Sequence, residues 1–554
     1  MKKLALLVLV FSLIFVILGL GEPIKYGGTL RFIGGGGWAQ FPDSMNPLLP
    51  EGGFSPVVAE IYEVLFYVNP LNGNITDLLG TSYEWKNNNL ELDINTREGV
   101  KWSDGTPFTA RDVAFTFNYI KKYPALDQLA VWSSTSGLES VEANGDNIVV
   151  FKFSKPNTPL FYYLSNIPII PEHIWSTIKN PVTFKNENPV GTGPFLFKSS
   201  SPQNNVILAV KNPDYWRKGR PYVDKLEIRA VKSNTTSLLM LLRHDADWGD
   251  CTPADPKKLW VDKDPELNKM WWPVNNANIL YLNTQKTPFD IPEFRKAVAL
   301  AIDKESLVEK AYHGSCGGVA HPTGIIPSQQ NEWLDPLLKD VNLRYSPQKA
   351  QELLTSIGFK KNSRGELMDS DGKVLPTYKI LVGAGWTDYI TMAQIISKNL
   401  ENLGIKTVID QEAGSTYMSS IMSGTYDMAI CWWAGEGPSP YYYYYQGFYP
   451  PFSGSKIGET SLSDYARYTN PIITAALETF SKTSDIHLQK QAIYAIERII
   501  VEDTPLVFLT NRTHFGCFSE AYLVGWPSDS NPYCAAEVID SPGGAMITVN
   551  VHLK

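Results

Sequence analysis

A strand–helix–strand unit in the second half of the chain places the strongest limit on its fold. Residues 379–382 and 405–409 are short apolar runs that predict two strands. Between them, residues 388–403 have the apolar spacing of a helix, and Gly404 is a typical residue to end it. Strands joined in this way are parallel, so we predict an α/β fold with a partly parallel sheet. The Gly383-Ala384-Gly385 turn lacks the spacing of a dinucleotide-binding loop.

Chain length and charge set the broad class of protein. A chain of 554 residues is too long for one core, so we expect two or three lobes. Hydrophobic residues make up 44% of the sequence, which is enough for large cores. The net charge is −8, and it becomes −10 without Lys2 and Lys3. This balance argues against nucleic acid as a partner and gives no basic patch for an anionic membrane.

The first 21 residues have the features of a signal peptide. Lys2 and Lys3 are followed by an almost wholly apolar run to Leu20, and Gly19-Leu20-Gly21 supplies small residues before Glu22. We therefore expect cleavage near Glu22 and a soluble periplasmic or extracellular protein. The apolar run is close to the lower length limit of a membrane span, so an uncleaved anchor is the alternative. There is no cysteine near the end of the run, so attachment as a lipoprotein is not supported.

The cysteines give little guidance about function. They are widely scattered, and their spacing with histidine does not suggest a zinc site. Export would permit disulfides, although an odd number leaves at least one cysteine without a partner in the chain. The best candidate pair is Cys517 and Cys534, which flank a loop containing glycine and proline.

Several segments carry local structural signals but no catalytic pattern. Leu226 and Ile228 alternate with charged residues, as in a half-buried strand. Thr109 and Asp112 have the spacing of a helix capping box, and Asp303 is placed to cap another helix. The glycine-rich segment 189–197 lacks the Gly-Lys-Ser/Thr of a phosphate-binding loop.

Five segments, taken in order, resemble one known class of proteins: residues 97–120, 189–197, 212–229, 287–312 and 494–509. Each is similar to a segment of the extracellular solute-binding proteins of peptide-type ABC transporters, family 5, and the strand–helix–strand unit is similar to their C-terminal lobe. The resemblance runs from about residue 25 to about residue 515. It implies capture and delivery of a solute rather than its conversion.

The resemblance also implies a fold. We expect the two-lobe periplasmic-binding-protein ("Venus flytrap") fold with an extra subdomain, in which closure about a hinge buries the ligand. The implied boundaries are a discontinuous lobe I (22–55, 188–275 and 513–554), the subdomain (56–187) and lobe II (276–512). We expect a monomer that works with an ABC transporter permease in the membrane.

The aromatic residues point to the ligand. The chain has 15 Trp and 28 Tyr, and sugar rings stack on such side chains. Trp432 and Trp433 follow an apolar strand and lead into a loop, where cleft contacts arise in α/β lobes. In peptide-binding members of the resembled family, a Trp-x-Gly-Asp segment in this region pairs with the ligand's amino terminus. Here Glu436 replaces that aspartate, which weakens a peptide anchor without excluding it.

Three more tryptophans are candidate ligand contacts. Trp386 follows a predicted strand end, Trp38 follows a run of four glycines in lobe I, and Trp248 lies where the resembled family crosses from helix to strand. The alternative for each, as for the Tyr441–Tyr445 cluster, is that a large aromatic residue fills a core or a lobe interface.

The ligand class stays open between two alternatives. Residues 321–336 resemble the branch of the family in thermophilic microbes that takes up β-linked gluco- or manno-oligosaccharides. We therefore favour an oligosaccharide, with an oligopeptide as the alternative.

Enzymatic and metal functions are remote alternatives. Glu436 and Asp247 could be proposed as the carboxylates of a glycosidase, but nothing in the sequence marks them as a pair. Asp245, Asp247 and Asp250 lack the glycine and terminal glutamate of a calcium loop. We expect no catalytic residue, no metal and no cofactor.

Overall fold

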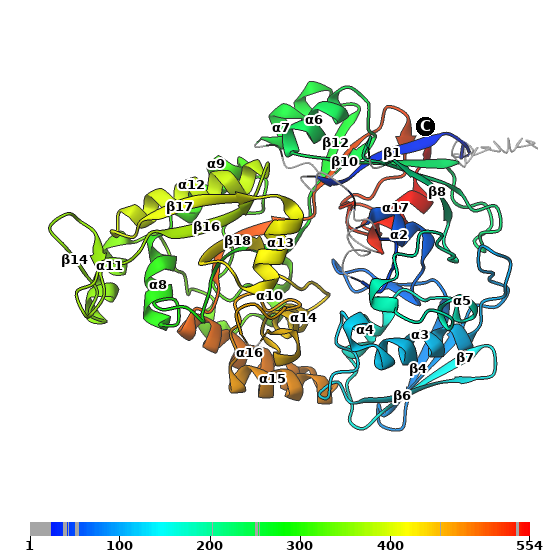
Figure 1. The fold of residues 1–554 in the computed structure, drawn as a ribbon, viewed down its shortest axis with the longest axis horizontal. Helices are drawn as coiled ribbons and strands as arrows, with labels where there is room; N and C mark the ends of the chain where they lie inside the picture. The colour runs from blue at the N-terminus through cyan, green and yellow to red at the C-terminus, as the bar shows by residue number, and fades with distance from the viewer. Residues whose placement is uncertain are drawn as a thin grey trace, which may run out of the picture.

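The computed structural model describes residues 24–36, 41, 44–49, 55–201, 203–249, 253, 255–454, 456–538 and 542–554. The expected signal peptide and Trp38 lie outside these residues. Three sheets organise the described chain: a seven-stranded, a five-stranded and a four-stranded one. Figure 1 shows them at the upper right, the left and the lower right of the molecule. We name the parts built around them lobe I, lobe II and the subdomain.

Lobe I is built on a mixed sheet. Its order is β12 (Asn268–Trp271), β20 (Gly516–Ser519), β11 (Trp248–Gly249), β1 (Thr29–Gly36), β10 (Lys225–Val231), β9 (Val206–Lys211) and β8 (Phe195–Ser201). Strand β1 runs parallel to β10 and β11, and the other pairs are antiparallel. Leu226 and Ile228 are buried while their charged neighbours are not, so the predicted alternation is confirmed. Its helices are α6 (Asn234–Leu242), α7 (Pro256–Leu259) and α17 (Gly543–Asn550). Helix α2 (Pro56–Ile61), at the start of the range expected for the subdomain, packs on α17 and β8 of this lobe.

Lobe II contains the predicted strand–helix–strand unit. The sheet order is β17 (Thr407–Glu412), β16 (Tyr378–Gly383), β18 (Met428–Trp432), β13 (Val274–Leu282) and β19 (Val507–Thr513). Helix α12 (Thr387–Glu401) joins the parallel strands β16 and β17, and Gly404 after it has a φ of 81°. The α/β class and the parallel unit are confirmed.

Further helices cover this sheet. They are α8 (Pro292–Ala301), α9 (Lys304–Tyr312), α10 (Pro327–Trp333), α11 (Pro347–Ser356), α13 (Gly414–Ser423), α14 (Pro440–Phe448), α15 (Pro471–Lys482) and α16 (Ile486–Asp503). The Asp303 side chain accepts a hydrogen bond from the backbone N–H of Ser306 at 3.1 Å, so the predicted cap of α9 is confirmed.

The subdomain is an antiparallel sheet covered by a helix. Its order is β4 (Gly80–Lys86), β5 (Glu91–Thr96), β7 (Ile148–Phe153) and β6 (Leu138–Asn144), and α3 (Ala110–Lys122) packs on β6 and β7. Thr109 and Asp112 form the predicted capping box at the start of α3. Two short helices, α4 (Leu160–Ser165) and α5 (Glu172–Trp175), complete the layer. Short two-stranded sheets lie outside the three large ones: β2 (Phe66–Val68) with β3 (Ile75–Asp77), β14 (Lys360–Lys361) with β15 (Leu367–Met368), and β21 (Leu523–Val524) with β22 (His552–Leu553).

The two large sheets are joined by two adjacent crossovers. Strand β12 of lobe I continues through Trp272 and Pro273 into β13 of lobe II, and β19 continues through His514 and Phe515 into β20. The backbone N–H of His514 donates to the Pro273 carbonyl at 3.0 Å. The rings of Trp272 and Phe515 meet edge to face, with centroids 5.6 Å apart. We call this pair of short connections the hinge between the lobes.

Lobe II also contacts the subdomain. Helix α14 carries Tyr441 to Tyr445, and its tyrosines pack against tyrosines of α4. In Figure 1 these two helices lie in the lower part of the view, whereas β12 lies at the top. The tyrosine cluster is therefore an interface between two parts of the chain.

Two remaining features concern membranes and cysteines. None of the helices within the described ranges is long and apolar enough to cross a bilayer. Cys517 and Cys534 are both fully buried, but they belong to two separate apolar clusters. The structure therefore lends no support to the predicted pair.

Candidate ligand-binding site

Two of the predicted tryptophans meet at the strand ends of lobe II. Strands β16 and β18 are parallel neighbours, so their carboxyl ends share one edge of the sheet. Trp386 follows β16, Trp432 ends β18, and their ring centroids are 6.1 Å apart. A Cβ atom on Gly383 would lie 2.4 Å from the Trp386 ring, so glycine is required for the indole to lie here.

Trp386 retains an unused hydrogen-bond donor. Its side chain is 9% exposed, and its ring also contacts Tyr389 and Tyr417. Its indole N–H has no hydrogen-bond partner among the described residues. A buried donor without a partner is costly, so a water molecule or a ligand group at this position would stabilise the site.

Trp433 and Trp248 lie in the cores of the two lobes. Trp433 points to the opposite face of its strand from Trp432, is 1% exposed and packs on Tyr443 and Phe508. Trp248 is fully buried, and its indole N–H donates to the Ala536 carbonyl at 2.7 Å. The structure brings Trp386 and Trp432 together but not these two.

A buried charged cluster lies at the hinge. The imidazole of His514 is 2% exposed, its Nδ1 atom is 2.6 Å from a Glu537 carboxylate oxygen, and its Nε2 atom is 3.4 Å from Oε2 of Glu436. The longer contact is an ion pair rather than a hydrogen bond. Arg512 donates to Glu537 at 2.6 Å, and Asn275 donates to Glu436 at 2.7 Å. We call Glu436, Arg512, His514 and Glu537 the hinge cluster.

The hinge cluster links the lobes. Arg512 belongs to β19 and Glu436 follows β18, both in lobe II. Glu537 belongs to the segment whose Ala536 carbonyl binds Trp248 of lobe I. The Arg512–Glu537 ion pair therefore spans the two lobes next to the crossovers.

The electrostatics of the cluster favour its charged forms. Burial alone would lower the pKa of His514, but Glu436 and Glu537 outweigh it and raise that pKa to about 10. Burial would raise the pKa of Glu537, but Arg512 and His514 lower it to about 2. The pKa of Glu436 is likewise lowered, because His514 outweighs the effect of burial. Two cations thus face two carboxylates, and the cluster is neutral overall.

Other polar atoms near the hinge lack partners among the described residues. They are Nε1 of Trp272, Oδ1 of Asn275, Nε of Arg512 and Oγ1 of Thr513. Such groups are normally satisfied by protein or ordered water. The hinge end of the molecule therefore holds several buried donors and acceptors without a partner, of which Asn275 is hydrogen-bonded to Glu436 through its other amide atom.

Sequence reasoning identified Glu436 but missed its partners. Its partners come from segments that lie far from Glu436 in the chain, and no motif spacing connects them with it: Asn275, Arg512, His514 and Glu537. One weak signal existed: Arg512 and His514, two residues apart, come shortly after the apolar run that ends at Leu509.

The other acidic candidate has a structural partner. Asp247 is buried and accepts hydrogen bonds from the backbone N–H, Nε and Nη2 of Arg31 at 2.7–3.1 Å. This ion pair joins the start of β11 to β1, so Asp247 stabilises lobe I. Asp250 lies outside the described residues.

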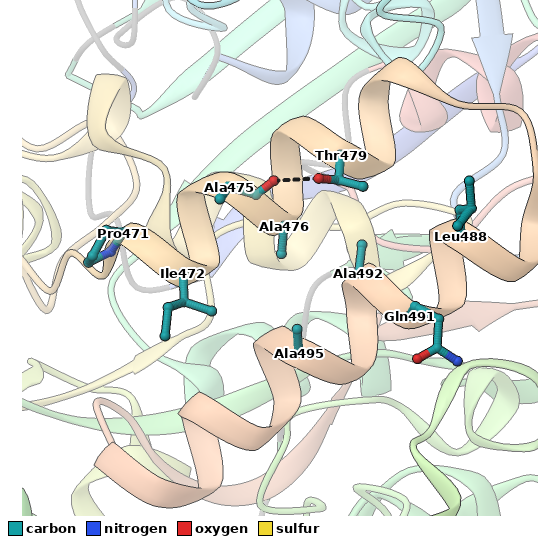
Figure 2. Close-up of a pocket in the computed structure, with 9 residues that line it drawn as sticks. All are labelled: Pro471, Ile472, Ala475, Ala476, Thr479, Leu488, Gln491, Ala492 and Ala495. Carbon is teal, nitrogen blue, oxygen red and sulfur yellow. Dashed lines mark hydrogen bonds between the residues drawn. The ribbon is translucent and has the colours of Figure 1, made fainter.

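A separate hollow lies between α15 and α16, away from the hinge. Figure 2 shows its lining, in which alanines of the two helices face each other: Pro471, Ile472, Ala475, Ala476, Thr479, Leu488, Gln491, Ala492 and Ala495. Ile472 and Leu488 at its rim are about half exposed. Its small side chains explain the close approach of the two helices.

Comparison with known proteins identifies the family. The model for bacterial extracellular solute-binding proteins, family 5, matches residues 74–455. The chain belongs to this family. Among curated members, the oligopeptide-binding protein AppA of Bacillus subtilis is 26% identical over 456 residues, which cover 79% of this chain and 78% of AppA. The peptide transport periplasmic protein SapA of Salmonella typhimurium is 23% identical over 498 residues, 85% of each chain.

Solved structures of family 5 proteins confirm the two-lobe fold with its extra subdomain. One is the mannohexaose-bound periplasmic oligopeptide-binding protein of an oligopeptide ABC transporter from Thermotoga maritima. It is 27% identical, with a TM-score of 0.85 over 95% of this chain and 98% of that one. Bacillus subtilis AppA in complex with a nonapeptide has a TM-score of 0.78 at 22% identity, over 96% of this chain and all of AppA. Family 5 proteins bind small peptide or oligosaccharide ligands and work with ABC transporter permeases. They are binding proteins, not enzymes.

Proposed function

We propose that this protein captures an oligosaccharide, of β-linked gluco- or manno-type, outside the cytoplasm and delivers it to an ABC transporter permease. The Trp386–Trp432 pair at the strand ends of lobe II carries the proposal. Two indole rings 6.1 Å apart, one with an unused N–H, offer a stacking face and a donor for ring hydroxyls. The similarity to the mannohexaose-bound protein over nearly the whole chain supports the same ligand class.

The remaining parts of the proposal follow from this role. We propose that the chain is exported with cleavage near Glu22, acts as a monomer and uses no metal or cofactor. Its domain boundaries would be 22–55, 188–275 and 513–554 for lobe I, 56–187 for the subdomain and 276–512 for lobe II. The ligand would lie between the lobes against Trp386, Trp432 and Glu436, with Trp38 of lobe I as a further contact.

An oligopeptide is the second candidate. The curated relatives reported above are named as peptide-binding or peptide-transport proteins. Glu436 also offers a carboxylate, although it is already paired with His514 and Asn275.

A thermal-shift screen separates the two candidates. The mature protein would be heated with cello-, manno-, xylo- and laminari-oligosaccharides, and in parallel with di- to pentapeptides. A ligand at about 100 times its dissociation constant stabilises the folded state by about 2.7 kcal/mol, which is readily measured. We expect an oligosaccharide to raise the melting temperature. If peptides alone did so, the oligosaccharide proposal would be wrong, and release of shorter sugars during incubation would favour a glycosidase instead.

A further inference from the structure

We propose that His514 is a specificity-determining residue: its imidazole is a built-in counter-charge of Glu436, the role that a ligand's ammonium group would otherwise have. The cleft would therefore accept hydroxyl and amide groups and reject cationic ones. This inference rests on the proposed function, because it names the ligand chemistry of the same site.

The position of His514 carries the first step. Both ring nitrogens face a carboxylate, Glu537 at 2.6 Å and Glu436 at 3.4 Å. A neutral imidazole could donate its one N–H to Glu537 but carries no charge for Glu436, whereas an imidazolium donates to Glu537 and also forms the ion pair with Glu436. The ring is 2% exposed and Glu537 is 5% exposed, so water does not compete for that contact, whereas Glu436 is 31% exposed.

The surrounding charges carry the second step. Arg512 neutralises Glu537 at 2.6 Å, which leaves His514 as the counter-charge of Glu436. Four other titratable groups are near: Asp388, Tyr389 and Cys431 around Arg512, and Tyr443 beside Glu436. Burial raises the pKa of Asp388 and the pKa of Cys431, which disfavours a charge on either. Both tyrosines are buried, and burial raises their pKa, so they stay neutral. An ammonium group arriving at Glu436 would add a third cation to a balanced cluster.

The third step depends on the carboxylate oxygen of Glu436 that has no hydrogen-bond partner. Its side chain is 31% exposed, and Asn275 and His514 both approach Oε2, so Oε1 has no partner among the described residues. A carboxylate oxygen can accept a hydrogen bond from a neutral hydroxyl or amide donor. Glu436 would thus bind a neutral ligand group while His514 balances its charge.

The test compares matched ligands and matched variants. Tetra-alanine and its N-acetylated form differ in the ammonium group alone, and manno-tetraose is a neutral sugar probe. Calorimetry would measure all three with the wild-type protein, His514→Gln, and the exposed control His487→Gln. Wild-type and control proteins should bind the free-amine peptide no better than the acetylated one. His514→Gln should prefer the free amine by about tenfold or more, because Glu436 then lacks its counter-charge.

The outcomes separate this inference from the proposed function. A wild-type protein that prefers the free amine tenfold overturns the role of His514, whether or not the variant folds. A folded His514→Gln protein without any gain for the amine also overturns it. If the gain appears, adding Glu436→Gln should abolish it, and persistence of the gain would be a third contrary result. Failure of every oligosaccharide in the thermal screen, together with a gain for the amine in His514→Gln, rejects the sugar and leaves the role of His514 supported.

Discussion

Tyr442 of lobe II packs its ring against Tyr162 of the subdomain, with centroids 4.6 Å apart and the planes inclined by 49°. Tyr163 and Tyr445 extend the same contact at 5.4 Å. The hinge joins lobe II to lobe I in the upper part of the view in Figure 1, and these tyrosines, on α14 and α4, join lobe II to the subdomain below it. A ligand held between the lobes would therefore be enclosed from both ends.

Replacing Tyr442 with alanine should weaken closure. An aromatic pair contributes about 0.5–1.5 kcal/mol beyond its buried area, so we expect up to a tenfold loss of ligand affinity. Calorimetry measures the affinity, and small-angle scattering should show a larger radius of gyration for the ligand-bound variant. Tyr123→Ala removes an aromatic contact inside the subdomain and serves as the control. Equal affinity and equal radius in both variants would show that closure does not depend on the tyrosine interface.

Replacing Trp386 with alanine should weaken ligand binding. The side chain lies beside Trp432 at the strand ends and retains an unpaired N–H. Loss of a stacking surface and a donor should weaken oligosaccharide binding by about 1–3 kcal/mol. Calorimetry with the sugar found in the screen measures the change. An unaltered affinity would mean that this edge of the sheet does not contact the ligand.

Replacing Trp433 with alanine should instead reduce the stability of the folded protein. This residue is buried among Tyr443, Tyr444, Phe448 and Phe508, so its removal leaves a cavity in lobe II. We expect a loss of about 3–5 kcal/mol in the free energy of unfolding. Denaturant unfolding without ligand measures it. A small loss of stability with a large loss of affinity would assign Trp433 to the ligand after all.

These two tryptophans show how far the sequence could lead. Local patterns were sufficient for the elements: the α12 unit, the capping box of Thr109 and Asp112, and the Asp303 cap each depend on neighbouring residues. Trp432 and Trp433 are also neighbours, and their opposite orientation follows from the period of a strand. Which of them faces the core depends on how α14 and β19 pack, and this is not encoded locally.

The hinge cluster was still less accessible to sequence reasoning. His514 lies 78 residues after Glu436 and 23 before Glu537, and these three meet because the chain crosses twice between the sheets. A single histidine after a strand is a common feature, and its pairing with two carboxylates appears in the tertiary structure alone. The sequence therefore led to Glu436 as a ligand anchor without its counter-charge.

The contribution of His514 to the stability of the protein should decrease as the pH becomes alkaline. The pKa of His514 is raised from an ordinary 6.5 to about 10, so its stabilising effect is complete below about pH 6.5 and is lost as the pH rises towards 10. The difference in free energy of unfolding between the wild type and His514→Gln should therefore shrink from pH 7 to pH 10. Denaturant unfolding across this range measures it, and His487→Gln should show no such trend. A constant difference would mean that the imidazole does not titrate in this window.

Replacing Glu436 with glutamine tests the ligand class directly. If the ligand is a neutral sugar, the amide can still hydrogen-bond to its hydroxyls, and the loss of affinity should be about 0.5–2 kcal/mol. If Glu436 instead binds the ammonium group of a peptide, a desolvated charge loses its partner and the loss should be about 2–5 kcal/mol. Calorimetry with the ligand from the screen distinguishes these values, after thermal unfolding has shown that the variant is folded. Ile472→Ser, in the hollow between α15 and α16, serves as the control. It should leave affinity unaltered because that hollow lies away from the hinge. We expect the smaller loss, because His514 already balances the charge of Glu436.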